Sequence, residues 1–343
     1  MSDEHFAGKG LFGYWQQTET YKDGLRVVEE VAARKNERKL VYEAVLHGHT
    51  GDAYPLKAGQ VLRQEQRHEV TQVVDWLFIT PDLSDWSTYG NCGTIQGFFP
   101  GLGYHFFGNI GRMKSLTMMV ADELPDDFAP PGWGRHFWLW HCSPEWAEFM
   151  YPNPPKGINS CHMNFVHGLN RIPAIHDIKD PAERRRIVNM LANNHNFQTF
   201  QTAHHHVEDD QTVIQFGSSP PVPKGTGVEF FVNVDCYAVV SSCPGGPIAP
   251  DVPVWNGEKA AQTYPVYFSV YDTGVEPVKQ MEWKDWDGYF YEAAEGGGKD
   301  VSPRTVESFK TKPDSGPMGE EFLPYGAYTD EEIEIAKKGR CSH

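Results

Sequence analysis

The sequence predicts an α+β protein that is mainly β, with a β-sandwich or barrel-like core, added helices and a long C-terminal extension. Short runs of β-branched and aromatic residues recur along the chain, while few segments have the apolar spacing of a helix. The 343 residues include 33 Gly and 25 Pro, which supply many turns between short strands. Many short strands joined by turn-rich connections are typical of an antiparallel sandwich or barrel.

The first predicted element is a short helix over residues 29–38, for which Val27, Val28, Val31 and Ala32 supply an apolar face. Runs rich in Val, Leu, Tyr and Phe then predict a series of strands. These strands cover residues 40–46, 58–63, 69–78, 115–120, 137–140, 212–216, 228–234 and 237–241.

Two further helices and three parts of the chain are predicted. One helix covers residues 181–193, and the other begins at Thr329 in the sequence Thr-Asp-Glu-Glu, which is a capping-box pattern. The order of elements suggests an N-terminal extension over residues 1–39, a core domain over 40–247 and a C-terminal extension over 248–343. The last part is rich in Trp, Tyr and Phe. We therefore expect it to pack on the core, on a neighbouring subunit or on both.

Composition excludes several classes of partner. The formal net charge of -16 argues against binding to nucleic acid or to anionic membranes. No apolar run approaches the roughly 18 residues of a membrane-spanning helix. The first residues lack the basic and apolar regions of a secretory signal, and six cysteines in so long a chain do not suggest a disulfide framework. We expect a cytoplasmic protein with no nucleic-acid or membrane partner.

Three cysteines lie in short segments that are rich in small polar residues, His or Asn. Cys142 follows the apolar run 137–140, Cys243 follows the run 237–241, and Cys161 lies in Asn-Ser-Cys-His-Met-Asn. Three thiolates at strand ends and in loops can hold one zinc ion and leave a fourth position open for water or substrate. No Cys-x-x-Cys pair is present, so the spacing alone is a weak signal.

A more specific signal comes from several short motifs that occur in a fixed order. They are Gly59 with Arg63, Gln72-Val73-Val74-Asp75, His136 six residues before Cys142, Cys161-His162-Met163-Asn164, and Ser241-Ser242-Cys243-Pro244. With these motifs, residues 40–247 resemble the urea carboxylase-associated family, long labelled a domain of unknown function.

The resemblance implies that Cys142, Cys161 and Cys243 bind zinc. Relatives in this family include the subunits of carboxyguanidine deiminase and the metal-bearing module of trimethylamine-oxide demethylase. Both break carbon–nitrogen bonds in small nitrogenous compounds. Members of the family assemble, so the resemblance also favours a homo-oligomer.

The motif positions supply the remaining candidate site residues. A neutral His beside a cysteine segment can exchange a proton near pH 7. The expected catalytic residues are Asp75, His136 and His162, and the expected substrate-binding residues are Arg63, Gln72 and Asn164. His141 is adjacent to Cys142, so on a regular strand it would point to the opposite face and pack elsewhere.

The expected function is a zinc-dependent hydrolase or lyase that cleaves a carbon–nitrogen or related polar bond of a small molecule. The alternative is a non-catalytic accessory or binding subunit of a catabolic complex, stabilised by zinc. A closed shell of four protein ligands would favour this alternative. An iron-dependent oxygenase of the cupin type is a third possibility, but its His-rich ligand set is not matched.

Overall fold

The computed structural model describes residues 11–68, 70–108, 113–139, 141–145, 160–194, 196–209, 211–217, 219–244 and 263–281. Contacts within the chain define two units, residues 1–281 and residues 282–343. The second unit lies wholly outside the described residues, and so does the helix predicted to begin at Thr329.

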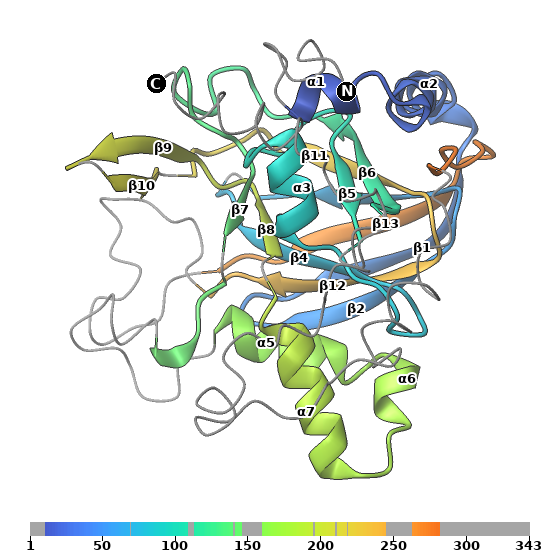
Figure 1. Ribbon diagram of the computed structural model, residues 1–343, viewed down its shortest axis with the longest axis vertical. Coiled ribbons are helices and arrows are strands. Elements are labelled where there is room, and N and C mark those ends of the chain that lie inside the picture. Colours follow the sequence, from blue (N-terminus) through green and yellow to red (C-terminus); the bar gives the residue numbers. More distant parts are fainter. Residues whose placement is uncertain are drawn as a thin grey trace, which may run out of the picture. The chain divides into compact units, whose positions relative to one another are not determined.

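The described part of the first unit contains six α-helices and thirteen strands (Figure 1). The helices are α1 (Leu11–Trp15), α2 (Glu19–Ala33), α3 (Tyr89–Gln96), α5 (Cys161–Leu169), α6 (Pro173–His176) and α7 (Pro181–Ala192), with one 3-10 turn, η2 (Lys35–Glu37). The strands are β1 (Lys39–Leu46), β2 (Gly51–Leu56), β3 (Gln60–Glu65), β4 (Val74–Ile79), β5 (His105–Phe107), β6 (Ser115–Asp122), β7 (Phe137–Leu139), β8 (Asn196–Thr199), β9 (Ala203–Glu208), β10 (Gln211–Phe216), β11 (Gly227–Val232), β12 (Cys236–Ser242) and β13 (Val266–Asp272). No helix in the described ranges is both long and apolar enough to cross a membrane.

Two antiparallel sheets form a sandwich, which confirms the predicted mainly β class. The six-stranded sheet has the order β1-β13-β3-β11-β6-β5, and the five-stranded sheet has the order β2-β12-β4-β8-β7. The chain alternates between the sheets over β1 to β4 and again over β11 to β13. A separate two-stranded ribbon, β9 with β10, extends from one side of the sandwich (Figure 1).

Aromatic side chains fill the space between the sheets. The Phe106 ring of β5 lies 4.2 Å from the Phe197 ring of β8, and the Trp76 ring of β4 lies 4.8 Å from the Phe230 ring of β11. All four side chains are fully buried. Contacts of this kind between rings add to the free energy gained by removing their large apolar area from water.

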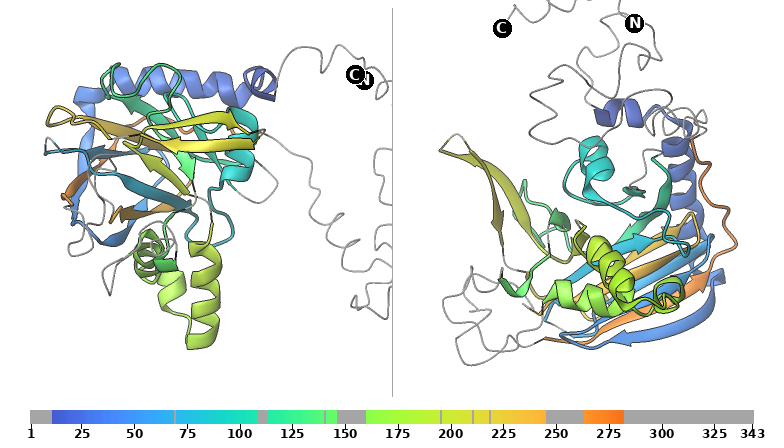
Figure 2. Two further views of the ribbon diagram at one scale, coloured as in Figure 1. Left: turned by 90° about the vertical axis from the view of Figure 1, so that its left-hand side faces the viewer. Right: turned by 60° about the horizontal axis from the view of Figure 1, so that its bottom comes forward.

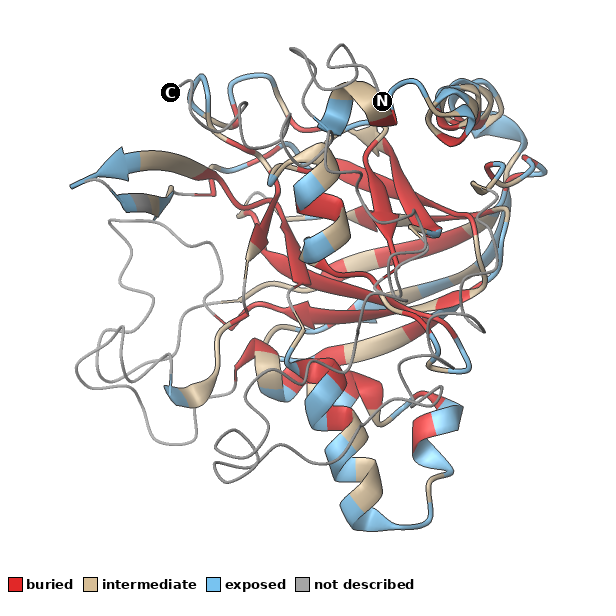
Figure 3. Ribbon diagram, in the orientation of Figure 1, coloured by how far each residue is buried: buried red, intermediate tan, exposed pale blue. Residues whose placement is uncertain are grey.

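Helices cover the outer faces of both sheets (Figure 2). Val27 and Val31 of α2 pack against Val61 and Phe231 on the six-stranded sheet. Beneath the five-stranded sheet, α5, α6 and α7 form a second helical layer that buries Leu77 and other apolar side chains of that face. The buried residues therefore run through both sheets and along the sheet-facing sides of the helices (Figure 3).

Several elements differ from those predicted. The helix predicted over residues 29–38 is α2, which begins ten residues earlier, because the Thr18 hydroxyl caps it by accepting a hydrogen bond from the Tyr21 N–H group. Strands β2, β5, β8, β9 and β13 and helices α1, α3, α5 and α6 were not predicted. β13 lies within the expected C-terminal extension, yet it pairs with β1 on one side and β3 on the other.

Candidate metal centre

Asp75 lies on the face of β4 that is turned away from the sandwich interior. Successive side chains of a strand point to opposite faces, and Trp76 belongs to the core between the sheets. Asp75 therefore shares its face with Leu77, which packs under the helices. Its neighbours in register are Gln198 on β8 and Ser241 on β12, so polar side chains from three strands meet on this face.

Three donors surround the Asp75 carboxylate, which is fully buried. Oδ1 accepts hydrogen bonds from Asn196 Nδ2 at 2.7 Å and Gln198 Nε2 at 2.8 Å, and Oδ2 accepts one from the Cys161 thiol at 3.1 Å. Burial and the negative charge of Cys142 raise the pKa of Asp75 to about 7, although the three hydrogen bonds oppose this shift. A carboxyl group with such a pKa can hold or release a proton near neutral pH.

Three cysteines from separate parts of the chain meet beside this carboxylate. Cys161 is the first residue of α5, Cys243 follows β12, and Cys142 follows β7. Their side chains pack together with Val73, and the Cys161 N–H group donates to Cys142 Sγ at 3.3 Å. The neighbouring thiols of Cys161 and Cys243 hold the pKa of Cys142 well below its ordinary value. Burial raises the pKa of Cys161, and the hydrogen bond with Cys142 raises that of Cys243.

The cluster brings metal-ligand atoms to one point. One ligand atom each from Asp75, Cys161 and Cys243 lies within 4.8 Å of the others, and all three residues are buried. The half-buried Cys142 adjoins the same cluster. Sulfur donors with one carboxylate oxygen suit zinc better than magnesium or calcium, which prefer oxygen ligands alone. The group could therefore hold a divalent metal ion.

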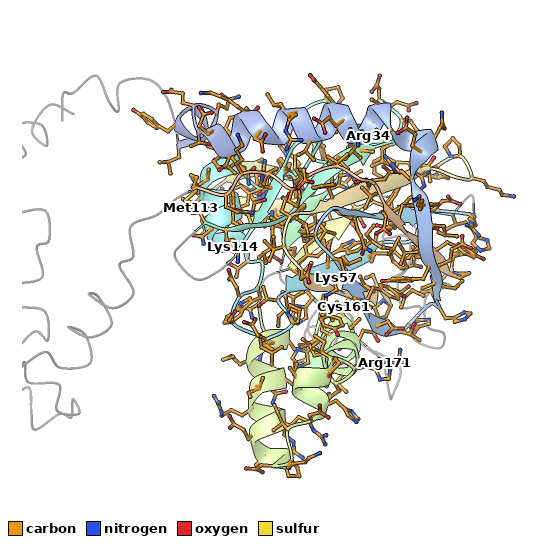
Figure 4. The ribbon with its side chains drawn as sticks, turned by 90° about the vertical axis from the view of Figure 1, so that its right-hand side faces the viewer. Arg34, Lys57, Met113, Lys114, Cys161 and Arg171 are labelled. Atoms are coloured by element: carbon orange, nitrogen blue, oxygen red, sulfur yellow. The ribbon has the colours of Figure 1, made fainter. Side chains whose placement is uncertain are left out.

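Helix α5 is anchored at the end that carries Cys161. The Ser160 hydroxyl caps the helix by accepting a hydrogen bond from the Met163 N–H group at 3.2 Å. One turn later, Asn164 Nδ2 donates to Ser241 Oγ at 3.0 Å and so ties the helix to β12. Cys161 consequently lies where the helical layer meets the strands (Figure 4).

Gln72 holds the backbone next to the centre. Its Nε2 donates to the carbonyl oxygens of Cys243 at 2.9 Å and Val73 at 3.0 Å, and its Oε1 accepts from the Tyr264 N–H group at 3.0 Å. The side chain is fully buried. The structure therefore places Gln72 beneath Cys243, with its amide occupied by main-chain groups.

Two histidines form a pair beside the cysteines. His141 Nε2 lies 3.2 Å from His162 Nδ1, and the two rings are nearly parallel, with centroids 5.4 Å apart. Burial lowers the pKa of His162, while the negative charges of Glu145 and Cys142 act in the opposite direction. The prediction that His141 packs elsewhere was wrong, because residues 141–145 lie beyond the end of β7 and strand alternation does not apply to them.

His136 is directed into the sandwich interior instead. Its Nδ1 accepts a hydrogen bond from the Phe200 N–H group at 3.1 Å, and its Nε2 lies 3.5 Å from Asp122 Oδ2 on the opposite sheet. Burial raises the pKa of Asp122, but the nearby His136 ring and the hydrogen bond from the Leu124 N–H group leave this pKa below its ordinary value. Although close to Cys142 in sequence, His136 is not brought to the thiol cluster.

Arg63 lies on the outer face of the six-stranded sheet. Its guanidinium forms ion pairs with Glu123 at 2.6 Å and with Glu229 at 3.2 Å. The next residue on β3, Gln64, faces the interior, because its Oε1 accepts a hydrogen bond from Thr199 Oγ1 of the other sheet. Arg63 therefore points to the opposite, outer face. The structure does not bring Arg63 to the cysteines.

The prediction from sequence missed Asn196 and Gln198. They alternate on β8, a strand of four residues whose sequence, Asn-Phe-Gln-Thr, lacks a clear apolar pattern. The available signal was weak: two amide side chains flank Phe197, which is the alternation expected of a strand with one polar face.

Comparison with known proteins supports the fold. The structure is similar to the crystal structure of a DUF1989 family protein from Silicibacter pomeroyi, with a TM-score of 0.61 and 18% sequence identity over 76% of this chain and 90% of that chain. This neighbour belongs to a family of uncharacterised domains. No protein-family model matches the chain, and no curated protein matches it.

Proposed function

We propose that this protein is a zinc-dependent enzyme that cleaves a carbon–nitrogen or related polar bond of a small molecule, by hydrolysis or by elimination. One observation carries the proposal: three thiols and a buried carboxyl group converge at one end of the five-stranded sheet. The residues that would hold zinc are Cys142, Cys161 and Cys243. Zinc bound there would supply a Lewis acid that polarises a substrate or lowers the pKa of a water molecule.

Asp75 and His162 are the proposed catalytic residues. Both hydrogen bonds from buried amides go to Asp75 Oδ1, so Oδ2 is the oxygen turned toward the thiols. A pKa of about 7 suits this group to accept a proton in one step and return it in another. His162 is half-buried beside Cys142, and so it lies between the buried cluster and the surface.

A second candidate is a non-catalytic protein in which zinc only stabilises the fold. The specific observation in its favour is that Asp75 is fully buried and offers a carboxylate oxygen within 4.8 Å of the sulfur atoms of Cys161 and Cys243. If Asp75 Oδ2 is a fourth ligand, the shell is closed and leaves no position for substrate.

The family relation, the substrate class, the oligomeric state and the cellular location are part of the same proposal. The order of the sequence motifs and the fold likeness to a DUF1989 protein support a relation to the urea carboxylase-associated family. From that relation we propose a small nitrogenous substrate, a homo-oligomer and a cytoplasmic location. Light scattering of the full chain at micromolar concentration tests the oligomer, which a monomeric mass would refute.

Metal analysis of the purified full chain tests the proposed centre. We expect about one zinc per chain, and a sharp loss of zinc in each of the Ser variants of Cys142, Cys161 and Cys243. Cys92→Ser is the matched control, because Cys92 is also buried but belongs to the core between the sheets, where its sulfur forms hydrogen bonds with the Phe107 backbone. Full zinc retention in all three variants would refute the site.

Cobalt substitution then separates the two candidates. Cobalt(II) bound by thiolates has visible absorption bands that depend on the number and type of its ligands. We expect azide to change these bands in the enzyme, because an open position can exchange its ligand. A spectrum that azide leaves unchanged, together with bands typical of four protein ligands, would favour the purely structural site.

A further inference from the structure

A continuous series of hydrogen bonds links Asp75 to His162. Asn196 Nδ2 donates to Asp75 Oδ1 at 2.7 Å, and Asn196 Oδ1 lies 3.2 Å from His141 Nδ1. His141 Nε2 in turn lies 3.2 Å from His162 Nδ1. Asn196 and His141 are each only 1% exposed, so solvent does not compete for the contact between them.

The hydrogen-bonding capacity of each group decides which atom donates and which accepts along this series. Asp75 Oδ1 accepts from two amides, so Asn196 must present its NH2 group to Asp75 and its carbonyl oxygen to His141. A carbonyl oxygen only accepts, and the proton of neutral His141 must therefore be on Nδ1. His141 Nε2 is then an acceptor, and His162 must donate from its own Nδ1.

Both rings would thus carry their proton on Nδ1, which is the minor tautomer of free histidine. The outward nitrogen of His162, Nε2, is left without a proton. Because Nδ1 faces His141, Nε2 points away from the pair. The arrangement leaves a proton acceptor at the half-buried edge of the cysteine cluster.

We propose that Asn196 is a positioning residue of the metal centre, which sets the orientation of Asp75 and the tautomer of the His141–His162 pair. The tautomer follows from these hydrogen bonds, whereas its use in a reaction rests on the proposed function.

Gln198 provides a matched comparison. It donates to the same oxygen of Asp75, at 2.8 Å against 2.7 Å for Asn196, and it is also buried. Among the described residues, no hydrogen bond joins Gln198 to His141. Loss of Gln198 therefore removes one donor from Asp75 but leaves the histidine pair with its carbonyl partner, whereas loss of Asn196 removes both.

The test is NMR spectroscopy of the full chain labelled with 15N-histidine, in which the ring nitrogen shifts report the tautomer. Signals are assigned with His141→Gln and His162→Gln. We expect both rings to be protonated on Nδ1 in the wild-type protein. We expect Asn196→Leu to release His141 from this tautomer and Gln198→Met to preserve it.

Protonation of His141 on Nε2 in the wild-type protein would overturn the proposal, and this result does not depend on any variant folding. An unchanged His141 tautomer in folded Asn196→Leu would also overturn it. The spectra are recorded with and without zinc. A protein that binds no zinc but has both Nδ1–H tautomers refutes the proposed function alone, whereas zinc binding with the other tautomer refutes this inference alone.

Discussion

Helix α5 packs on the sheet so closely that a single added methyl group should disturb the proposed metal centre without touching a proposed ligand. A Cβ atom added at Gly51 of β2 would lie 2.1 Å from the backbone carbonyl oxygen of Asn164 on α5. Ordinary contact begins near 3.4 Å, so helix and strand must separate by roughly 1 Å or more. Backbone atoms cannot swing aside as a flexible side chain can. The same helix carries Cys161, and the shift would move its sulfur relative to Cys243.

We therefore expect Gly51→Ala to weaken both folding and zinc binding. Overpacking of this kind costs about 1–3 kcal/mol in the free energy of unfolding. Metal–ligand distances tolerate about 0.2 Å, and changes next to a ligand shell typically reduce metal affinity about 10- to 100-fold. Urea unfolding of the metal-free protein measures the first effect, and competition with a chelator measures the second.

Two other glycines, Gly168 and Gly101, serve as a parallel case and a control for Gly51→Ala. Gly168 of α5 would place a Cβ 2.7 Å from the Asp52 carbonyl oxygen, so Gly168→Ala should act in the same direction. In an exposed helix this change would stabilise by up to about 1 kcal/mol. At Gly101 an added Cβ has nothing within 4 Å, and Gly101→Ala should leave both quantities unchanged. If Gly51→Ala matches Gly101→Ala in zinc affinity, the seating of α5 does not determine the site.

Three further outcomes follow from buried charged and titratable groups. Burial lowers the pKa of His105 to about 3. Below the ordinary pKa of 6.5, the unfolded chain therefore binds a proton that the folded chain does not. The free energy of unfolding consequently falls as the pH drops from about 6.5 toward 3. Between pH 7 and pH 5 this loss is about 2 kcal/mol by urea unfolding, and a His105→Gln variant with the same pH dependence would contradict the assignment. Glu229→Gln should lower the free energy of unfolding by about 3–5 kcal/mol, because the Arg38 side chain, which is 5% exposed, loses its charged partner. A decrease below about 1 kcal/mol would show that the ion pair is dispensable for stability. Asp75→Asn should fold, since its remaining oxygen still accepts two amide hydrogen bonds. Competition with a chelator should show weaker zinc binding, because the variant lacks the negative charge of the carboxylate. An unchanged zinc affinity would show that the carboxylate does not contribute to metal binding.

The sequence was sufficient for the fold class and for several strands. Runs of β-branched and aromatic residues are local signals, so β1, β6, β11 and β12 lie close to their predicted bounds. It also pointed to Cys142, Cys161 and Cys243 as a set, through short motifs and not through spacing. The structure brings these three side chains together. It also places Cys236 in the core between the sheets, as expected of a cysteine inside an apolar strand.

Only the tertiary structure decided which other residues belong to the centre. His136 and Asp75 both precede tryptophan-containing apolar runs, yet they face opposite sides of one sheet, because a strand's start and register decide where each side chain points. Asn196 reaches Asp75 across 121 positions of sequence, through pairing of β4 with β8. A contact between such distant segments leaves no local pattern, since sheet packing alone makes them neighbours. Short motifs could therefore point to the three cysteines, whereas the contacts of Asn196 with Asp75 and His141 became visible only when the strands were paired.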